Sequence, residues 1–251
     1  MAARKLARRP ERDKQGAFLI EGVTGVMDAL RSRAEVREVF VDKDLEDAEL
    51  SKLIEAEGIR SYSVGRDVIQ TLSDTVTPQG VVAVVSDPSV GLEALRASDL
   101  VLVLADVRDP GNAGTLVRSA AAAGAGTVVF ASGSVDPLHP KVVRSAAGAL
   151  FEVALVRGVA LDDAVAVLKE ETTTVVGTSA GADEDMYSAD LRGPVALVLG
   201  NEAWGLPHET AGLMDIVVRI PMPGPVESLN VSTAGSILLF EALRQRLAKP
   251  K

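Results

Sequence analysis

Six short segments of the sequence are almost wholly apolar, and helix-length stretches separate most of them. The apolar segments are 100–105, 127–130, 153–156, 174–177, 195–199 and 216–220. Continuous apolar runs are typical of strands buried on both faces of a parallel sheet, whereas half-exposed strands alternate apolar and polar residues. Helices are predicted over 113–123, 141–148, 161–170 and 230–247. This part of the chain is therefore predicted to be an α/β fold with a mostly parallel sheet.

The segment in front predicts a smaller α/β domain. Strands are expected at 17–20, 36–41, 60–64 and 81–85, and helices at 22–30, 45–57 and 66–72. A turn-rich stretch, Pro88 to Gly91, then precedes the short segment Leu92 to Ala97. We therefore expect a domain over 1–90, a linker over 91–98 and a second domain over 99–251.

Composition excludes several classes of protein. Of the 251 residues, 47% are apolar, so a buried core is expected and wholesale disorder is not. The chain has no cysteine, which excludes disulfides and thiolate metal sites and suits a cytoplasmic protein, and its two histidines, His139 and His208, lie far apart. We expect no metal centre and assign both histidines structural or exposed positions. No apolar run approaches the ~18 residues of a membrane span, and no secretory signal is recognisable.

The net charge of −9 taken alone argues against a nucleic-acid partner, but the basic residues are unevenly distributed. The first fourteen positions hold six basic residues against two acidic ones: Arg4, Lys5, Arg8, Arg9, Arg12 and Lys14 against Glu11 and Asp13. Two interpretations stay open for this segment, a basic arm that holds phosphates and a solvated tail. Lys141 and Arg144, three residues apart on a predicted helix, add a second basic contact.

Three loops follow predicted strands at the edge where open α/β sheets bind ligands. In the first, Asn112 is predicted to cap a helix and Arg118 to lean back towards its N-terminus, which would make an anion pocket. In the second, Glu202 lies between two glycines and is expected to accept a hydrogen bond or to pair with Arg118. The alternatives are a plain N-cap with a surface arginine and a turn with a solvated glutamate.

The second and third loops leave further questions open. Trp204, the single tryptophan, is predicted to be either a core plug or a lid. The third loop has three prolines and a glycine within five residues, which predicts a stiff wall for a ligand, and Ser228 and Asn230 are placed to cap the last helix. Neither GxGxxG nor GxxxxGK[ST] occurs, so the two commonest nucleotide signatures are missing.

Taken together, these stretches resemble the SpoU (TrmH-like) family of RNA ribose 2′-O-methyltransferases. The matching stretches are DPGNAGTLVRS (109–119), KVVRSAAGAL (141–150), LGNEAWGL (199–206) and IPMPGPVESLNVS (220–232). In front, FLIEG (18–22) looks like the family's substrate-binding domain, which is similar to a ribosomal L30e-type fold. The resemblance implies a deep C-terminal trefoil knot, a homodimer with the active site near the subunit interface, and S-adenosylmethionine bound in the knot. The donor-binding positions it implies are Thr178, Ser179, Ala180, Gly181, Leu199, Gly200, Ile220, Met222, Ser228 and Leu229.

The resemblance also implies a reaction and a substrate. Arg118 is expected to grip a phosphate and stabilise the developing alkoxide rather than act as a base, since an arginine is protonated at neutral pH. Asn112, Glu202, Ser228 and Asn230 are expected to fix the geometry. Ribosomal RNA, 23S in particular, is the first choice of substrate and transfer RNA the second. Two biological roles for the methylation stay open, resistance to thiopeptide antibiotics and a housekeeping modification. A non-catalytic RNA-binding protein and a dehydrogenase on a plain α/β fold remain as alternatives.

Overall fold

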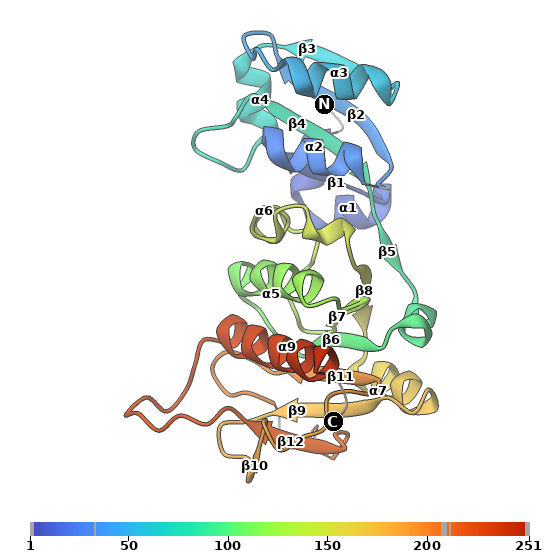
Figure 1. The fold of residues 1–251 in the computed structure, drawn as a ribbon. Helices are drawn as coiled ribbons and strands as arrows, with labels where there is room; N and C mark the ends of the chain where they lie inside the picture. Colours follow the sequence, from blue (N-terminus) through green and yellow to red (C-terminus); the bar gives the residue numbers. More distant parts are fainter. Residues whose placement is uncertain (1–2, 33, 207–209, 211, 249–251) are drawn as a thin grey trace. The chain divides into compact units, whose positions relative to one another are not determined.

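The six apolar segments form strands of one parallel sheet in the computed structural model, which describes residues 3–32, 34–206, 210 and 212–248. The sheet has the order β10-β12-β9-β11-β6-β7-β8-β5, and each of its pairings is parallel (Figure 1). Its strands are β5 (Ser89–Val90), β6 (Leu100–Leu104), β7 (Thr127–Ala131), β8 (Ala154–Val159), β9 (Thr174–Thr178), β10 (Glu184–Asp185), β11 (Val195–Leu199) and β12 (Ile216–Arg219). The α/β class and the mostly parallel sheet are confirmed. The short strands β5 and β10 were not predicted.

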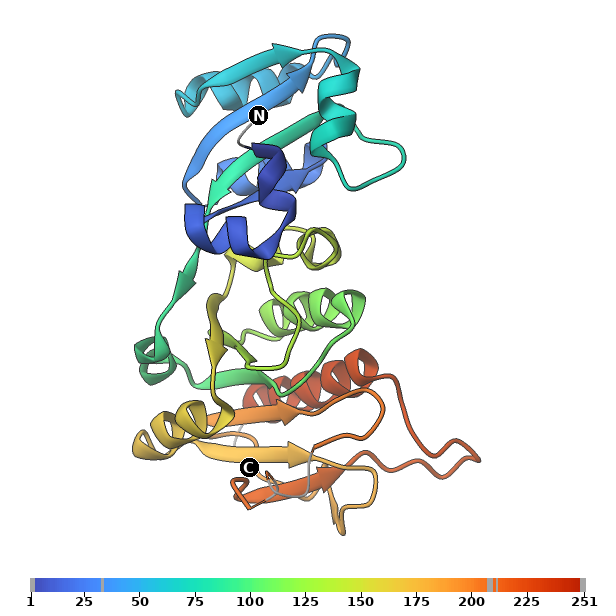
Figure 2. The same cartoon turned by 180° about the vertical axis from the view of Figure 1, so that it is seen from behind.

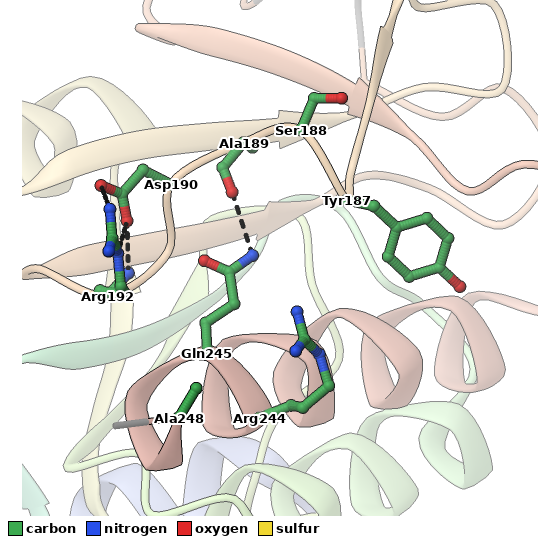
Figure 3. Close-up of a pocket in the computed structure, with 8 residues that line it drawn as sticks. All are labelled: Tyr187, Ser188, Ala189, Asp190, Arg192, Arg244, Gln245 and Ala248. Atoms are coloured by element: carbon green, nitrogen blue, oxygen red, sulfur yellow. Dashed lines mark hydrogen bonds and ion pairs between the residues drawn. The ribbon is translucent and has the colours of Figure 1, made fainter. Parts of the chain in front are cut away.

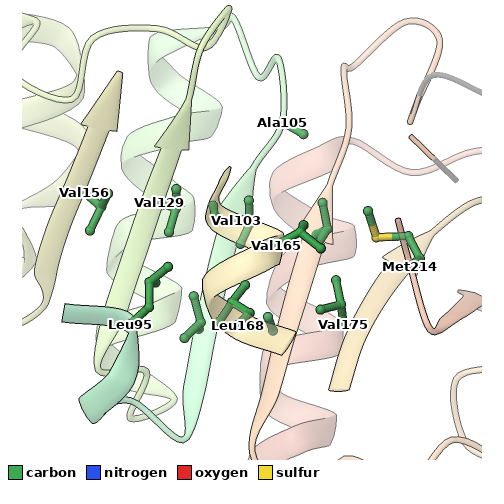
Figure 4. Packing of buried hydrophobic residues seen from close by; sticks show 13 residues of the cluster. Leu95, Val103, Ala105, Val129, Val156, Val165, Leu168, Val175 and Met214 are labelled. Carbon is green, nitrogen blue, oxygen red and sulfur yellow. The ribbon is translucent and has the colours of Figure 1, made fainter. Parts of the chain in front are cut away.

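Helices cover both faces of this sheet. The 3₁₀ helix η2 (Leu92–Ala97) and α7 (Leu161–Glu170) pack on one face, where Leu95 and Leu168 meet Val103, Val129 and Val198 (Figure 4). On the other face, α9 (Val231–Leu247) lies along α5 (Pro110–Ala122). Double coverage explains why the strands carry apolar residues at successive positions.

The described chain forms two compact units, and their division differs from the predicted domains. The first unit is Met1–Pro88 with Leu138–Glu152, and the second is Ser89–Pro137 with Val153–Lys251. The predicted linker 91–98 forms η2 and belongs to the second unit, because Leu95 is buried in its core. Segment 138–152, predicted to lie in the C-terminal domain, packs in the first unit, where α6 (Pro140–Ala146) lies against β1.

The first unit has a four-stranded mixed sheet of order β1-β4-β2-β3. Its elements are η1 (Ala3–Ala7), α1 (Arg9–Gln15), β1 (Ala17–Glu21), α2 (Val23–Arg31), β2 (Val36–Asp42), α3 (Ala48–Ala56), β3 (Ser61–Val64), α4 (Arg66–Leu72), β4 (Val81–Ser86), α6 and η3 (Ala149–Phe151). The helix predicted at 45–57 begins only at Ala48, because the side chain of Asp47 accepts from two backbone N–H groups and caps it.

The basic N-terminal segment is folded, so its interpretation as a solvated tail is wrong. Ala3 and Leu6 are buried in a core with residues of β1, β4 and α4, and η1 and α1 cover that side of the sheet (Figure 2). The Arg12 side chain donates to the carbonyl oxygens of Leu6 and Ala7, both at 3.0 Å, and is only 2% exposed. Arg12, which was expected to bind RNA, therefore holds the segment in place. Among the described residues, no helix is both long and apolar enough to cross a membrane.

Candidate active site

The second and third predicted loops, together with residues 178–181 after β9, line one cavity of about 360 Å³ in the second unit, at the carboxyl ends of β9, β11 and β12. Residues 106–118 of the first loop are not part of its lining. All ten positions expected to bind the donor line it: Thr178, Ser179, Ala180, Gly181, Leu199, Gly200, Ile220, Met222, Ser228 and Leu229. The side chains of Leu206, Val218 and Leu238 add apolar surface, and Glu202 and Trp204 also line the cavity. The cavity therefore combines an apolar wall with backbone from glycine-containing loops.

Gly200 allows the chain to fold back tightly on itself beside this cavity. A Cβ atom at this position would lie 2.2–2.4 Å from backbone atoms of Gly205 and Leu206. The chain turns back here, because Asn201 and Gly205 exchange backbone hydrogen bonds of 3.0 and 2.9 Å. Gly205 has a positive φ of 70°, which glycine adopts without strain. The tight turn 201–205 thus sets the positions of Glu202 and Trp204.

Glu202 joins the first loop to this turn. Its Oε1 accepts from the N–H of Asp109 at 3.0 Å and from the side-chain amide of Asn112 at 3.3 Å, and its Oε2 accepts from the N–H of Arg108 at 3.4 Å. Asn112 Oδ1 in turn accepts from Asn230 Nδ2 at 3.0 Å. Three predicted site residues from three loops are therefore linked by hydrogen bonds. The expected pairing of Glu202 with Arg118 is wrong, since backbone and amide donors satisfy the carboxylate.

The pKa of Glu202 lies below its ordinary value. Partial burial acts to raise the pKa, but the hydrogen bonds from the backbone of Asp109 and Glu202, from the Asn112 side chain and from the backbone of Arg108 outweigh it. The carboxylate is consequently ionised at neutral pH. Protonation is expected only as the pH falls below the ordinary 4.5 of a glutamate, so Glu202 accepts hydrogen bonds and does not exchange a proton near neutrality.

The helix caps in these loops differ in part from those predicted. Helix α5 begins at Pro110 and is capped by Asp109, whose side chain accepts from the N–H of Asn112 at 2.8 Å. The helix starts earlier than predicted because a proline suits the first helical position. Asn112 therefore lies in the first turn and is not the cap. Asn230 caps α9, as predicted, by accepting from Ser232 and Thr233. Ser228 is exposed and lines the cavity without capping the helix.

Arg118 lies apart from this network. It is exposed on α5 and makes no hydrogen bond or ion pair within the part of the chain that the structure describes. It is not among the residues that line the cavity. At about 1.5 Å per residue, its backbone is roughly 12 Å along the helix from Pro110, so an unpaired guanidinium projects from the side of α5 beyond the first turn.

The basic residues predicted to bind RNA fall into two groups. Arg4, Lys5, Arg8, Arg9 and Lys141 are exposed, although Arg9 also pairs with Asp13 at 3.7 Å. Arg144 instead pairs with Glu21 and, at 3.4 Å, with Asp74 inside the first unit. Its guanidinium thus fixes α6 to β1. His139 caps α6 through Nδ1, which confirms its structural role, whereas His208 lies outside the described residues.

Residues that were not predicted support the turn 201–205, which lines the cavity. Asn201 is buried, and its Nδ2 donates to the backbone oxygen of Asp106 at 2.9 Å and to Asp106 Oδ2 at 3.2 Å. Asp106 also pairs with Arg108 at 2.7 Å, and the Arg108 guanidinium lies 5.3 Å from the ring centroid of Trp204. The position of Asn201 directly after an apolar strand was the available signal. Trp204 is exposed, so its interpretation as a core plug is wrong.

A second hollow of about 290 Å³ lies between the end of α9 and residues 187–192 (Figure 3). Its two arginines are neutralised, since Arg192 pairs with Asp190 at 2.8 Å and Arg244 with Glu241 at 2.7 Å. The Gln245 side chain donates to the oxygen of Ala189 at 3.0 Å and holds this segment to the helix. These contacts favour a structural role. Among the described residues, no cluster of His, Cys, Asp and Glu suits a metal ion.

Comparisons with known proteins agree over the whole length. Residues 99–240 match the model of the SpoU rRNA Methylase family, and residues 1–83 match an MRM3-like substrate binding domain. The chain is 35% identical over 237 residues to the 23S rRNA (guanosine(2553)-2'-O)-methyltransferase RlmP of Bacillus subtilis (strain 168), covering 94% of this chain and 92% of that protein. It is 37% identical over 240 residues to the 23S rRNA (guanosine-2'-O-)-methyltransferase RlmB of Salmonella typhimurium, and the match covers 91% of this chain and 98% of that protein. The crystal structure of the SpoU methyltransferase AviRb from Streptomyces viridochromogenes in complex with AdoMet matches with a TM-score of 0.90 at 30% identity, over 99% of this chain and 98% of that one.

Proposed function

Because the chain belongs to the SpoU rRNA methylase family, we propose that it transfers a methyl group from S-adenosylmethionine to a ribose 2′-hydroxyl of structured RNA, with 23S rRNA as the substrate. The observation that carries this proposal is the cavity at the ends of β9, β11 and β12, whose lining residue Glu202 is linked through Asn112 to Asn230. The names of the relatives support the substrate. The dehydrogenase alternative has no support from the family.

The cavity fits S-adenosylmethionine. Its volume of about 360 Å³ lies within the range of roughly 300–1,000 Å³ for small-molecule pockets. The glycine positions 181 and 200 leave backbone groups accessible, which agrees with the missing glycine-rich fingerprint. The residues proposed to hold the donor are the ten that line the cavity as predicted. When bound, the donor supplies a methyl group activated by a sulfonium.

The remaining site residues position the acceptor. We assign Glu202, Asn112 and Asn230 to holding the first and third loops at the cavity, and Ser228 to contacting the ribose. A guanidinium carries five N–H donors and no acceptor, so Arg118 is not assigned the removal of the hydroxyl proton. Its unpaired guanidinium is suited to gripping the adjacent phosphate and to stabilising the developing alkoxide, while the hydroxyl proton leaves to phosphate or water.

We further propose the family's trefoil knot, a cytoplasmic location and a homodimer. The strand order supports the knot, since the chain leaves β11, crosses β9 and pairs as β12 with the side of β9 away from β11. The dimer is supported by α9, on which Phe240 and Leu247 are 49% and 74% exposed and lie seven residues apart on one face.

Replacing Phe240 by aspartate is expected to convert a dimer into a monomer, because an isologous contact places the new charge twice in one apolar interface. Analytical ultracentrifugation measures the change. The matched control is Val76→Asp, which alters a fully exposed valine of the first unit and should leave the dimer intact. A Phe240→Asp variant that sediments as the wild type contradicts this assignment of the interface.

Removing the exposed charges of Arg4, Lys5 and Arg8 together, each by alanine, is expected to weaken RNA binding. Each lost phosphate contact reduces the dependence of log K on log salt concentration by about 0.7–0.9, so the slope should fall by roughly 2–3. Filter binding over a salt series measures it. The control replaces Lys43, Lys52 and Arg60, which are also exposed in this unit, and an equal fall there would contradict a role specific to the N-terminal segment.

The function is tested by incubating the full chain with radiolabelled S-adenosylmethionine and total RNA, then mapping the blocked 2′-position. Label in 23S rRNA at one 2′-oxygen supports the proposal. Label in transfer RNA would correct the substrate. Absence of label from unmodified ribosomal and transfer RNA alike, with donor binding intact, would favour the non-catalytic alternative.

A further inference from the structure

Trp204 lies at the wall of the donor cavity with much of its indole in solvent. It is the single tryptophan of the chain, and it is 58% exposed while lining the cavity. Tryptophan offers a large rigid aromatic area, and such side chains are enriched among residues that dominate binding. Nothing in the proposed grip on the donor or in the action of Arg118 requires an aromatic residue at this position.

The indole is held by a preorganised turn. Trp204 belongs to the turn 201–205, whose two ends exchange hydrogen bonds. Asn201 anchors the turn from below: its side chain is 6% exposed, donates twice to Asp106 and accepts from the N–H of Ala203 at 2.8 Å. A buried amide with its hydrogen bonds satisfied favours one conformation. The aromatic ring is therefore presented by a supported turn.

A cation from a different loop flanks the ring. The Arg108 guanidinium is 5.3 Å from the ring centroid, within the range of a cation–π interaction. Asp106 holds Arg108 by an ion pair of 2.7 Å, and Asp106 has a positive φ of 65°, which is uncommon for a residue with a side chain. Two loops thus bring one aromatic ring and one guanidinium together beside the cavity that Trp204 lines.

We propose that Trp204, supported by Arg108, is the stacking platform for the base of the nucleotide whose ribose is methylated. This inference rests on the proposed function. The base and the 2′-oxygen are attached to neighbouring carbons of one ribose, so an oxygen that enters the cavity brings its base to the cavity wall. RNA-modifying proteins read unstacked bases by stacking them on aromatic side chains and guanidinium planes. Arg108 contacts the ring and acts as its positioning residue.

If Trp204 stacks on the base, removing its side chain should weaken RNA recognition and leave donor binding unchanged. Trp204→Ala is expected to lower kcat/KM for RNA by about 5- to 100-fold, the effect of losing one base–aromatic contact. Trp204→Phe should retain most of the activity. The affinity for S-adenosylhomocysteine, measured by calorimetry, should stay within about twofold of the wild type. Tyr187→Ala removes an aromatic residue of similar exposure elsewhere in the same unit and serves as the matched control.

A double-mutant cycle gives the decisive test. The second change is in the RNA, an abasic ribonucleotide at the methylated position that keeps the 2′-hydroxyl. We expect the abasic RNA to reduce the rate of the wild type and to cause little further loss in Trp204→Ala. Both changes remove the same contact, the stacking of the base on the indole. The fluorescence of the single tryptophan should change with intact RNA and remain nearly unchanged with abasic RNA.

Two results would overturn the platform. One is equal loss in Trp204→Ala on intact and abasic RNA, which would leave the two changes uncoupled. The other is weakened S-adenosylhomocysteine binding in Trp204→Ala, which would make the indole part of the donor site. If the wild type methylates no RNA, the proposed function itself fails and the platform falls with it. If the wild type methylates RNA but the Trp204→Ala and abasic changes are uncoupled, the proposed function stands and only the stacking platform is refuted.

Discussion

Arg118→Lys is expected to lower kcat/KM for RNA methylation by about 100-fold or more, the usual cost of losing one donor to a developing oxyanion. Lysine keeps the charge but cannot contact a phosphate and the 2′-oxygen through two fixed N–H groups. Donor affinity should not change, because Arg118 does not line the cavity. Single-turnover transfer and calorimetry with S-adenosylhomocysteine measure the two quantities.

Arg118→Ala should be more severe than Arg118→Lys and should be partly rescued by added guanidinium at low concentration. The rescue separates a chemical role from a structural one, since Arg118 is exposed and without a partner in the described part of the chain. Near-full transfer by Arg118→Lys would refute the bidentate contact and would mean that a positive charge alone is sufficient at this position.

Gly200→Ala is expected to remove donor binding and to lower stability together. Its Cβ would lie within 2.4 Å of the Gly205 backbone, which cannot rotate away as a side chain does, so the turn that carries Glu202 and Trp204 must move. Forcing backbone apart in a packed region costs roughly 3 kcal/mol, or about 6–12 °C in Tm for a chain of this length. Calorimetry with S-adenosylhomocysteine and thermal unfolding measure the two effects.

The control for this prediction is Gly193→Ala. A Cβ at Gly193 meets no atom within 4 Å, so both donor affinity and Tm should stay close to the wild type. A Gly200→Ala variant that binds S-adenosylhomocysteine normally would mean that the turn 201–205 is not part of the donor site.

The fold class was predictable because strands that are buried on both faces of a sheet appear in the sequence as continuous apolar segments. The ends of α4 and α7 were predicted correctly, and β11 was placed at the residues where it lies. The start of α5 was misplaced because Pro110 was taken for loop, although proline suits a first helical turn. Arg12 was misassigned because its carbonyl partners form only in the folded N-terminal segment.

The donor-binding positions of the candidate site were predictable, but the contacts between its loops were not. The ten cavity positions came from the family resemblance, and they meet in one cavity. The partner of Glu202 was wrong because spacing along the chain does not reveal which loop donors reach a carboxylate first. Asp106 and Asn201 were missed for a similar reason: both follow apolar strands in the sequence, but the hydrogen bond between their two loops and the positive φ of Asp106 cannot be predicted from local sequence.

A crystal structure with S-adenosylmethionine tests the central claim most directly. We expect the donor in the 360 Å³ cavity, against the backbone of Gly200 and Leu229, with its methyl group directed towards Glu202 and the hydrogen bonds that link it to Asn112 and Asn230. A donor bound anywhere else in the chain, or a methyl group directed away from that network, would contradict it.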